Sequence, residues 1–302
     1  IKVSPEQIII VSGASQGYLL IGKVLLEVYK RLYIEEPMVR FIPNIFKYLG
    51  YELIPIDVDN SGIRVGEILI DRKKSLILLT PSHQFPTGTI LSIQRRQEVL
   101  KWAEKTDSYI IEDDYDSEYR YKGVPIPPIW SLNNTRVIYV GTFSKSLAPS
   151  LRLGFLIVPE KLIDLFLKVK FEMNMYSSPT EQRALDIFIK NGFLERHIYR
   201  MRKIYKRKRS LLEEELKSYF GEDLNVEGNF AGLHMGVEFN VKKYPNVNWE
   251  SSVNYKVRVY PFSRYSFKNK EYKNKIVLGY GNLSFEEIRE GIKRIYNFIK
   301  SK

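Results

Sequence analysis

Short runs of apolar residues alternate with longer amphipathic stretches along the first half of the chain. The apolar runs are rich in β-branched and aromatic residues, which favours strands, and the stretches between them have helical periodicity. Strands that alternate with helices are typical of a mostly parallel sheet with helices on both faces. We predict strands near residues 7–12, 31–35, 75–80, 108–113, 136–143 and 153–158.

The second half of the chain has a different order of elements. Helical sequence dominates from about residue 161 to 220, and a final helix is expected from Phe285 to Ile299. Between them we predict strands at 231–239, 256–261 and 275–280. The sequence therefore predicts a large α/β domain over residues 1–194 and a smaller C-terminal α+β domain over residues 195–302.

Composition restricts the class of protein. The 302 residues are 44% hydrophobic and 27% charged, as in an ordinary globular protein with one large and one smaller core. The absence of cysteine excludes disulfides and thiol chemistry and fits a reducing cytosol, so we expect a cytoplasmic protein. No apolar stretch is long enough to span a membrane, and the three histidines are not at ligand spacing, so neither a membrane partner nor a metal site is predicted.

The net charge of +12 invites a nucleic-acid interpretation. The basic residues are densest from Arg196 to Arg209, but apolar residues recur at helical spacing through the same segment. We favour an amphipathic helix with a solvated basic face, while a surface that assists DNA contact by another domain stays open. The chain itself contains no base-reading motif.

A lysine follows the apolar run Val137–Val140 among hydroxyl and basic residues. Lys145 stands close to Thr142 and Ser144, and Arg152 follows seven positions later. A lysine amine condenses with aldehydes, while hydroxyls and a guanidinium hold a phosphate dianion. A lysine at a strand end is by itself more often a solvated surface residue, so this motif needs support from elsewhere.

Three further motifs provide that support. Asp113 ends another apolar run, and Tyr115 lies on the same side of an extended chain; such acids also bind metals or cap helices. Beside a lysine and an arginine, however, a carboxylate suits the ring nitrogen of pyridoxal phosphate. The turns in Ile8–Gly17 and Leu79–Gly88 also follow expected strands, where ligands bind in open α/β sheets. The first turn, taken alone, is more often a simple helix cap.

The chain resembles the fold-type I, pyridoxal-phosphate-dependent aminotransferases of class I/II. It is most similar to the aminotransferase-like effector domain of MocR/GabR-type transcriptional regulators of the GntR family, through the motifs TPSHQFPTGTI, IIEDDYDSEYRY, GTFSKSLAPSLRLGF and AGLHMGVEF. The resemblance implies pyridoxal 5'-phosphate as the cofactor, bound to Lys145 as an internal aldimine. It also implies that Asp113 pairs with the pyridine nitrogen and that Tyr115 bonds the phenolic oxygen.

The same resemblance implies how the phosphate is held and where this chain departs from the aminotransferases. Phe85 stands where aminotransferases have an asparagine, so His83 either approaches the ring or caps its own turn. The residues implied to hold the phosphate are two hydroxyl residues, a guanidinium and two backbone amides: Thr142, Ser144, Arg152, Ala14 and Ser15.

Two further departures bear on the choice between an enzyme and a regulator. Asn282 stands where aminotransferases clamp the substrate carboxylate with an arginine, and an amide supplies no charge. Met38 and Val39 replace a Gly-Tyr pair whose tyrosine stacks on the cofactor ring, and they offer no aromatic face. Arg40 either takes over part of the carboxylate's charge or is a surface arginine.

Weak substrate clamping with a complete cofactor site favours a sensor over a fast enzyme. We expect a homodimeric effector domain that senses an amino compound, an amino acid or pyridoxal phosphate itself. The chain starts at Ile1 without methionine, so we expect it to be the C-terminal part of a longer protein that binds DNA through an N-terminal winged helix-turn-helix. A working aminotransferase is the alternative, and a scaffold with a relic site is a third interpretation.

Overall fold

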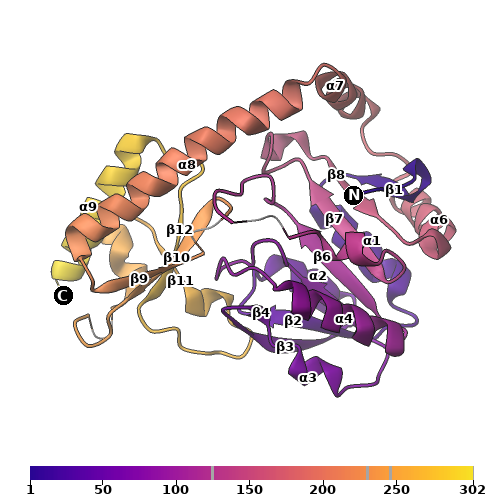
Figure 1. Cartoon of the computed structure of the whole chain (residues 1–302), viewed down its shortest axis with the longest axis horizontal. Helices are drawn as coiled ribbons and strands as arrows, with labels where there is room; N and C mark the ends of the chain where they lie inside the picture. Colours follow the sequence, from indigo (N-terminus) through magenta and orange to yellow (C-terminus); the bar gives the residue numbers. More distant parts are fainter. Residues whose placement is uncertain (124–125, 229–230, 245–246, 302) are drawn as a thin grey trace.

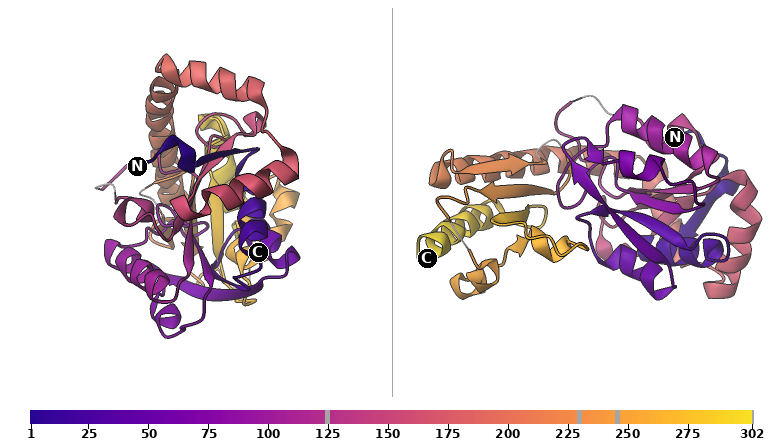
Figure 2. Two further views of the ribbon diagram at one scale, coloured as in Figure 1. Left: turned by 90° about the vertical axis from the view of Figure 1, so that its right-hand side faces the viewer. Right: turned by 90° about the horizontal axis from the view of Figure 1, so that it is seen from below.

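The protein is built around two separate β-sheets. The computed structural model describes residues 1–123, 126–228, 231–244 and 247–301, and Figure 1 shows the chain coloured along its length. One sheet has eight strands and the other has four. Seen from below, the four-stranded sheet with its helices lies beside the larger part of the molecule (Figure 2).

The large sheet is mostly parallel. Strands β7, β6, β5, β2 and β3 pair in parallel, while β8 is antiparallel to both of its neighbours and β4 is antiparallel to β3. The prediction of a mixed α/β fold with a mostly parallel sheet is confirmed. From one edge to the other the strands are β1 (Ile8–Val11), β8 (Gly154–Ile157), β7 (Val137–Thr142), β6 (Tyr109–Asp114), β5 (Leu76–Leu79), β2 (Arg31–Glu36), β3 (Glu52–Asp59) and β4 (Gly62–Ile63).

Helices cover both faces of the large sheet because its central strands are apolar on both sides. In β5, Leu76 and Leu78 belong to one buried cluster, and the alternate residues Ile77 and Leu79 belong to the other. One face packs against α1 (Ala14–Leu25), α2 (Phe41–Tyr48) and α6 (Ile163–Asn174). The other face packs against α3 (Gly66–Leu69), α4 (Ile93–Lys105) and α5 (Ile129–Leu132).

A long helix connects the two sheets. After α6 the chain forms α7 (Pro179–Lys190) and then α8 (Phe193–Phe220), which runs from α7 to the four-stranded sheet (Figure 1). Only the second half of α8 is buried, through Leu212, Leu216 and Phe220. The basic segment Arg196–Arg209 lies within this single helix, as its sequence predicts.

The four-stranded sheet is antiparallel throughout and is covered by α8 and α9. Its strands in spatial order are β11 (Tyr260–Pro261), β12 (Lys275–Gly279), β10 (His234–Phe239) and β9 (Leu224–Glu227), and α9 spans Phe285–Lys300. Helix α9 begins with a capping box, in which Ser284 and Glu287 bond each other's backbone amides. Short 3-10 turns lie at η1 (Pro5–Gln7), η2 (Pro149–Leu151), η3 (Glu160–Leu162), η4 (Trp249–Tyr255) and η5 (Phe262–Tyr265).

Strands β3, β4 and β9 are absent from the sequence-based prediction. Strand β3 contains Pro55 and several acids and is only partly buried, so it lacks the apolar run that identifies its neighbours. Strand β11 is much shorter than the strand predicted at 256–261, because η4 and a left-handed Lys256 occupy the segment before it. Helix α8 continues without a break through the domain boundary expected after residue 194, which stays a prediction.

No helix in the described parts of the chain is both long and apolar enough to cross a membrane.

The centre of the large sheet provides a test of the packing. Leu78 is fully buried between β2 and β6, so we expect Leu78→Ala to lower the free energy of unfolding by about 2–5 kcal/mol. The matched control is Val28→Ala, since Val28 is 60% exposed, and it should change stability by less than about 0.5 kcal/mol. Urea unfolding followed by circular dichroism measures both, and equal effects would contradict this packing.

Candidate functional site

A cavity of about 350 Å³ opens at the carboxyl edge of the large sheet. Strands β1, β2, β5, β6 and β7 run in the same direction, so the loops that follow them meet at this edge. The cavity is lined by Ala14, Ser15, Tyr18, Met38, Val39, Phe41, Ile42, Thr80, Phe85, Asp113, Tyr115, Thr142, Ser144, Lys145 and Arg152. The structure thus brings together eight of the residues that the sequence proposes for a cofactor, namely Ala14, Ser15, Asp113, Tyr115, Thr142, Ser144, Lys145 and Arg152.

An anion-binding corner forms where β1 ends. Gly13 turns the chain with φ of +79°, and α1 then begins at Ala14, so the first backbone N–H groups of the helix are free for a ligand. The Arg152 guanidinium lies directly on this turn and donates to the Ser12 carbonyl at 3.3 Å. A Cβ on Gly13 would lie only 2.7 Å from Nη2 of Arg152, so a side chain here would displace the guanidinium, and the positive φ itself favours glycine.

Lys145 enters the cavity from the loop after β7. Its side chain is exposed, and among the described residues its ammonium has no hydrogen-bond or ion-pair partner. The backbone amide of Ser144 donates to Oγ1 of Thr142 at 3.2 Å, which orders the turn that carries the lysine. An amine that is accessible and unpaired is suited to attack a carbonyl group.

Asp113 lies near the end of β6 and is buried at another side of the cavity. The pKa of Asp113 is raised to about 7, mainly by burial and also by nearby acids such as Asp114 and Asp116, although a hydrogen bond from Tyr18 lowers it. A cation beside this carboxyl would favour its ionised form. The protonated nitrogen of a pyridine ring is such a cation.

These residues fit pyridoxal phosphate by the chemistry of their side chains. The cavity combines a buried acid, a free amine and a corner with a guanidinium and a helix N-terminus. A cationic heterocycle, an aldehyde and a phosphate are the complementary groups.

Tyr115 lines the cavity, but its hydroxyl already has a partner in this structure. It donates to the His83 carbonyl at 2.8 Å and lies 3.3 Å from Nδ1 of the same residue. Burial raises the pKa of Tyr115 well above 10, so it is a neutral donor. The role of Tyr115 as a hydrogen-bond partner of the cofactor's phenolic oxygen stays a prediction.

Apolar side chains form the remaining wall of the cavity. Met38 and Val39, the residues predicted in place of a stacking tyrosine, both line it. Phe85 adds an aromatic ring that packs edge-on against Tyr265 with centroids 5.0 Å apart. The cavity therefore also contains aromatic rings, from Phe85 in the loop after β5 and from Phe41 at the start of α2.

Three of the proposed residues, Arg40, Asn282 and His83, do not line the cavity. Arg40 donates to the Ser266 carbonyl at 2.8 Å and lies over the Phe267 ring, facing a different hollow. Asn282 is exposed in the turn before α9. The roles of Arg40 and Asn282 toward a carboxylate stay predictions, and their placement in this chain does not support them.

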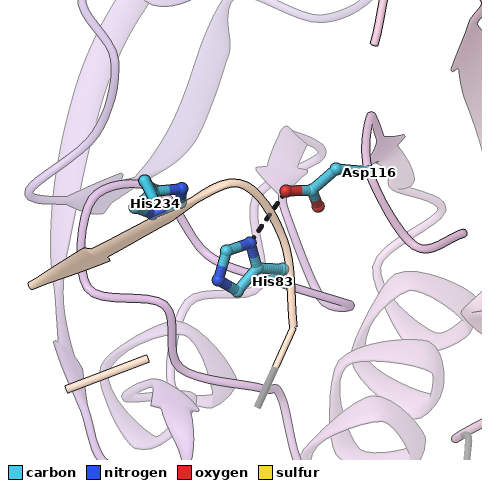
Figure 3. A group of neighbouring side chains, drawn as sticks. All are labelled: His83, Asp116 and His234. Atoms are coloured by element: carbon cyan, nitrogen blue, oxygen red, sulfur yellow. Dashed lines mark hydrogen bonds and ion pairs between the residues drawn. The ribbon is translucent and has the colours of Figure 1, made fainter. Parts of the chain in front are cut away.

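His83 is buried and neither lines the cavity nor caps its own turn through its ring. Its Nδ1 lies 2.9 Å from Oδ2 of Asp116, and its ring centroid lies 4.5 Å from that of His234 (Figure 3). Burial lowers the pKa of His234 well below 6.5, with smaller effects from His83 and Lys145. No sequence pattern connects Asp116 and His234 with His83, because these residues approach it only through the fold.

Tyr18 is a further cavity residue, and the sequence-based prediction does not include it. It is four residues after Ala14 in α1, hence on the same face of the helix, and it bonds Asp113. The helical spacing alone could have identified it as a cavity residue.

Comparison with known proteins agrees with this geometry. Residues 1–269 match the family described as "Aminotransferase class I and II". The uncharacterized HTH-type transcriptional regulator YdeL of Bacillus subtilis (strain 168) is 37% identical over 299 residues, covering 98% of this chain and 63% of YdeL. The probable rhizopine catabolism regulatory protein MocR of Rhizobium meliloti is 32% identical over 296 residues, covering 98% of this chain and 60% of that protein.

A solved structure shows the same arrangement of elements. The kynurenine aminotransferase of Pyrococcus horikoshii, solved in complex with PMP, superposes with a TM-score of 0.87 at 29% identity, covering 97% of this chain and 75% of that chain. The chain belongs to the aminotransferase class I and II family, and its fold is that of the fold-type I transferases. It spans about three fifths of the length of the two curated relatives named above.

The buried acid predicts a pH dependence of the cofactor-free chain. The pKa of Asp113 is about 7 in the folded protein against an ordinary value of 3.8, so between these pH values the folded chain holds a proton that the unfolded chain has lost. The free energy of unfolding therefore falls as the pH rises toward 7, by at most about 1.4 kcal/mol per pH unit for this group. Above pH 7 it levels off. In Asp113→Asn this contribution should vanish.

Urea unfolding of both proteins from pH 5 to 8 measures the difference. Other buried acids, such as Glu35, are present in both proteins, so only the difference between the two curves reports on Asp113. Parallel curves would show that Asp113 does not titrate in this range.

Proposed function

We propose that this chain is the pyridoxal-phosphate-binding effector domain of a MocR/GabR-type transcriptional regulator. The observation that carries the proposal is the meeting of Lys145, Asp113 and Arg152 around one cavity. The regulators YdeL and MocR, which are similar over almost all of this chain, support a role in transcription. The DNA-binding part of such a regulator would lie outside these 302 residues.

Each side chain has a distinct task in this proposal. The Arg152 guanidinium and the amides of Ala14 and Ser15 hold a phosphate at the α1 N-terminus. Asp113 holds a proton at the ring nitrogen, and burial strengthens that interaction. The cofactor supplies an aldehyde and an electron-accepting ring when bound.

Lys145 would supply the amine that links the chain to the cofactor, and a competing amine ligand would free it. The released ammonium then needs new partners, and the described residues near it include the buried imidazole of His234, whose pKa Lys145 lowers. Release of Lys145 would therefore change the interactions between the loop after β7 and the second sheet. Such a change is a means by which ligand binding favours one arrangement of the regulator.

The charges of the cavity support a sensor over a fast enzyme. Among the described residues, Arg152 is the only arginine that lines the cavity, and it lies at the phosphate corner. An amino-acid substrate would find no second guanidinium in the described part of this cavity for its carboxylate. Poor clamping of the substrate reduces turnover far more than it reduces binding of an amine.

A working aminotransferase is the second candidate. It is favoured by the completeness of the cofactor residues and by the similarity to an aminotransferase structure that holds PMP, the amine form of pyridoxal phosphate.

We further propose that a second copy of the chain covers the surface beside the lysine loop. Helices α6 and α7, the segment between them and the start of α8 expose apolar side chains, including Phe171, Met175, Tyr176, Ile187 and Phe193. An apolar hollow between the lysine loop and α7 adjoins them, lined by Leu147, Leu151 and Phe188 among others.

The lysine is tested by removing its amine. Lys145→Ala should lose the visible absorption of bound cofactor, and borohydride should no longer fix the cofactor covalently to the chain, as read by intact-mass spectrometry. Lys168→Ala removes an exposed lysine on α6 and should behave as wild type. Covalent fixation in Lys145→Ala would show that another residue carries the cofactor.

The phosphate corner is tested by Arg152→Met, which keeps much of the side-chain length and removes the charge. We expect pyridoxal-phosphate affinity to fall by about 10–100-fold, since charge-assisted hydrogen bonds contribute roughly 1.5–3 kcal/mol. Affinity for pyridoxal, which lacks the phosphate, should be nearly unchanged. An equal loss for both ligands would show a general defect of the site.

Addition of amino acids to the cofactor-loaded chain separates the two functions. A spectral shift without repeated production of keto acid supports the effector domain, and rapid, repeated conversion supports the aminotransferase. A colourless protein that takes up no cofactor would contradict both.

A further inference from the structure

The strand order of the large sheet divides the cofactor cavity into chemically different parts. The anion-binding corner belongs to the loops after β1 and β7, which lie on one side of β6, while β5 and β2 lie on its other side. The loops after β5 and β2 and the start of α2 contribute the apolar residues of the cavity, Met38, Val39, Phe41, Ile42 and Phe85, here called the apolar wall. A ligand that extends from the cofactor toward β5 and β2 therefore meets apolar side chains.

Two aromatic rings of the apolar wall are accessible. Phe41 is 51% exposed and Phe85 is half-buried, whereas Met38 and Ile42 are almost completely buried. An accessible ring beside a cavity stabilises an apolar ligand, because their contact removes apolar surface from water. The cavity volume of about 350 Å³ is at the lower end of the range for ligand sites, roughly 300–1,000 Å³, so a ligand that shares it with the cofactor must be small.

Arg40 directly follows the apolar wall in the sequence but is held away from the cavity. Its Nη2 donates to the Ser266 carbonyl at 2.8 Å, and its guanidinium lies over the Phe267 ring. The buried carboxylate of Glu36 fixes this segment, since it accepts from the Ser266 hydroxyl and from the Phe267 amide, the latter at 2.6 Å. Because its partners are anchored in this way, we expect Arg40 to supply no charge to the cavity.

Buried acids adjoin the cavity. Thr80 lines it, and the amide of Thr80 donates to the buried carboxyl of Glu35 at 3.1 Å. The pKa of Tyr115, which also lines the cavity, is raised mainly by burial and also by nearby acids, among them Asp116 and Glu35. Such a negative field favours an ammonium group and opposes a further carboxylate in a buried place.

We propose that the effector of this domain is a small apolar primary amine that carries no carboxylate group. The inference rests on the proposed function and names the class of ligand that the same cavity accepts. The amine nitrogen replaces Lys145 at the cofactor, and the apolar part of the ligand packs on the apolar wall. A carboxylate there would lose its hydration, and the described part of the cavity has no second guanidinium to replace it.

The exchange at Lys145 is balanced in atoms and electrons. The double bond of the cofactor's aldehyde carbon passes from Nζ of Lys145 to the nitrogen of the incoming amine, and the two protons of that amine pass to Nζ. No oxidant, reductant or further reactant is needed. Since a primary amine and an amino acid undergo the same exchange, the surroundings of the cavity decide which of them binds.

Matched pairs of ligands test the inference on the wild-type chain. The cofactor-loaded chain is titrated with phenethylamine and L-phenylalanine, and with isoamylamine and L-leucine, while the visible spectrum reports binding. The members of a pair differ only in the α-carboxylate, and their affinities for free pyridoxal phosphate correct for the reactivity of each nitrogen. After this correction we expect each amine to bind at least about 10-fold more tightly than its amino acid.

Borohydride provides a second readout that depends on neither colour nor turnover. A ligand that replaces Lys145 frees the lysine amine, so borohydride should then fix less cofactor to the chain, as read by intact-mass spectrometry. At equal concentrations, phenethylamine should reduce this fixation more than L-phenylalanine does. Ethanolamine, a primary amine without an apolar part, should also reduce it less than phenethylamine.

A charge introduced into the apolar wall should weaken the preference for amines. Val39 lines the cavity, and in Val39→Arg we expect the affinity ratio of phenethylamine to L-phenylalanine to fall by at least about 10-fold. The matched control is Val28→Arg, which adds the same charge elsewhere. Val28 is 60% exposed and precedes β2, hence it lies at the edge of the sheet remote from the cavity, and its variant should keep the wild-type ratio.

The outcomes separate a failure of this inference from a failure of the proposed function. Uptake of cofactor followed by equal or tighter binding of both amino acids would overturn the inference and leave the cofactor site intact. No uptake of pyridoxal phosphate would overturn the proposed function and the inference together.

Discussion

The functional chemistry of this chain depends on the in-register parallel pairing of its central strands. In β6 and β7, Asp113 lies opposite Val140, so both strands end at the same edge of the sheet. The pairing places the acid on β6 and the lysine loop after β7 around one cavity, although about thirty residues separate them in the chain. A shift in register by one residue would turn Asp113 to the other face.

Burial and charge then divide the cavity into unlike parts. Asp113 is surrounded by other acids and a tyrosine, so the proton is bound tightly at that side. Arg152, in contrast, lies at a helix N-terminus, and this part of the cavity favours anions. Lys145 lines the same cavity without a hydrogen-bond or ion-pair partner in the described chain, which leaves its amine free for covalent chemistry. These unlike environments orient a ligand that has a cationic ring and an anionic phosphate.

The second sheet completes the surroundings of the cavity from outside. The amide of Gly232 donates to the Tyr119 carbonyl at 2.8 Å, and Arg120 forms an isolated bridge with Ala231, so the start of β10 is joined to the loop after β6. This contact places the ring of His234 next to the ring of His83. The start of the second sheet therefore lies beside the proposed cofactor site, since Phe85 lines the cavity and its ring centroid is 4.8 Å from that of His234.

The sequence by itself determined the α/β class and the residues that line the cavity from four loops, because each such residue directly follows a local apolar run. It did not identify β3, because Pro55 and the acids of this strand interrupt its apolar run. It also did not identify Tyr18, which reaches the cavity through helical spacing. Only the tertiary structure decided that Arg40 turns to Ser266 and that His83 meets His234. The physical reason is that hydrophobic periodicity is encoded between near neighbours, whereas contacts between separate sheets depend on packing that no short segment specifies.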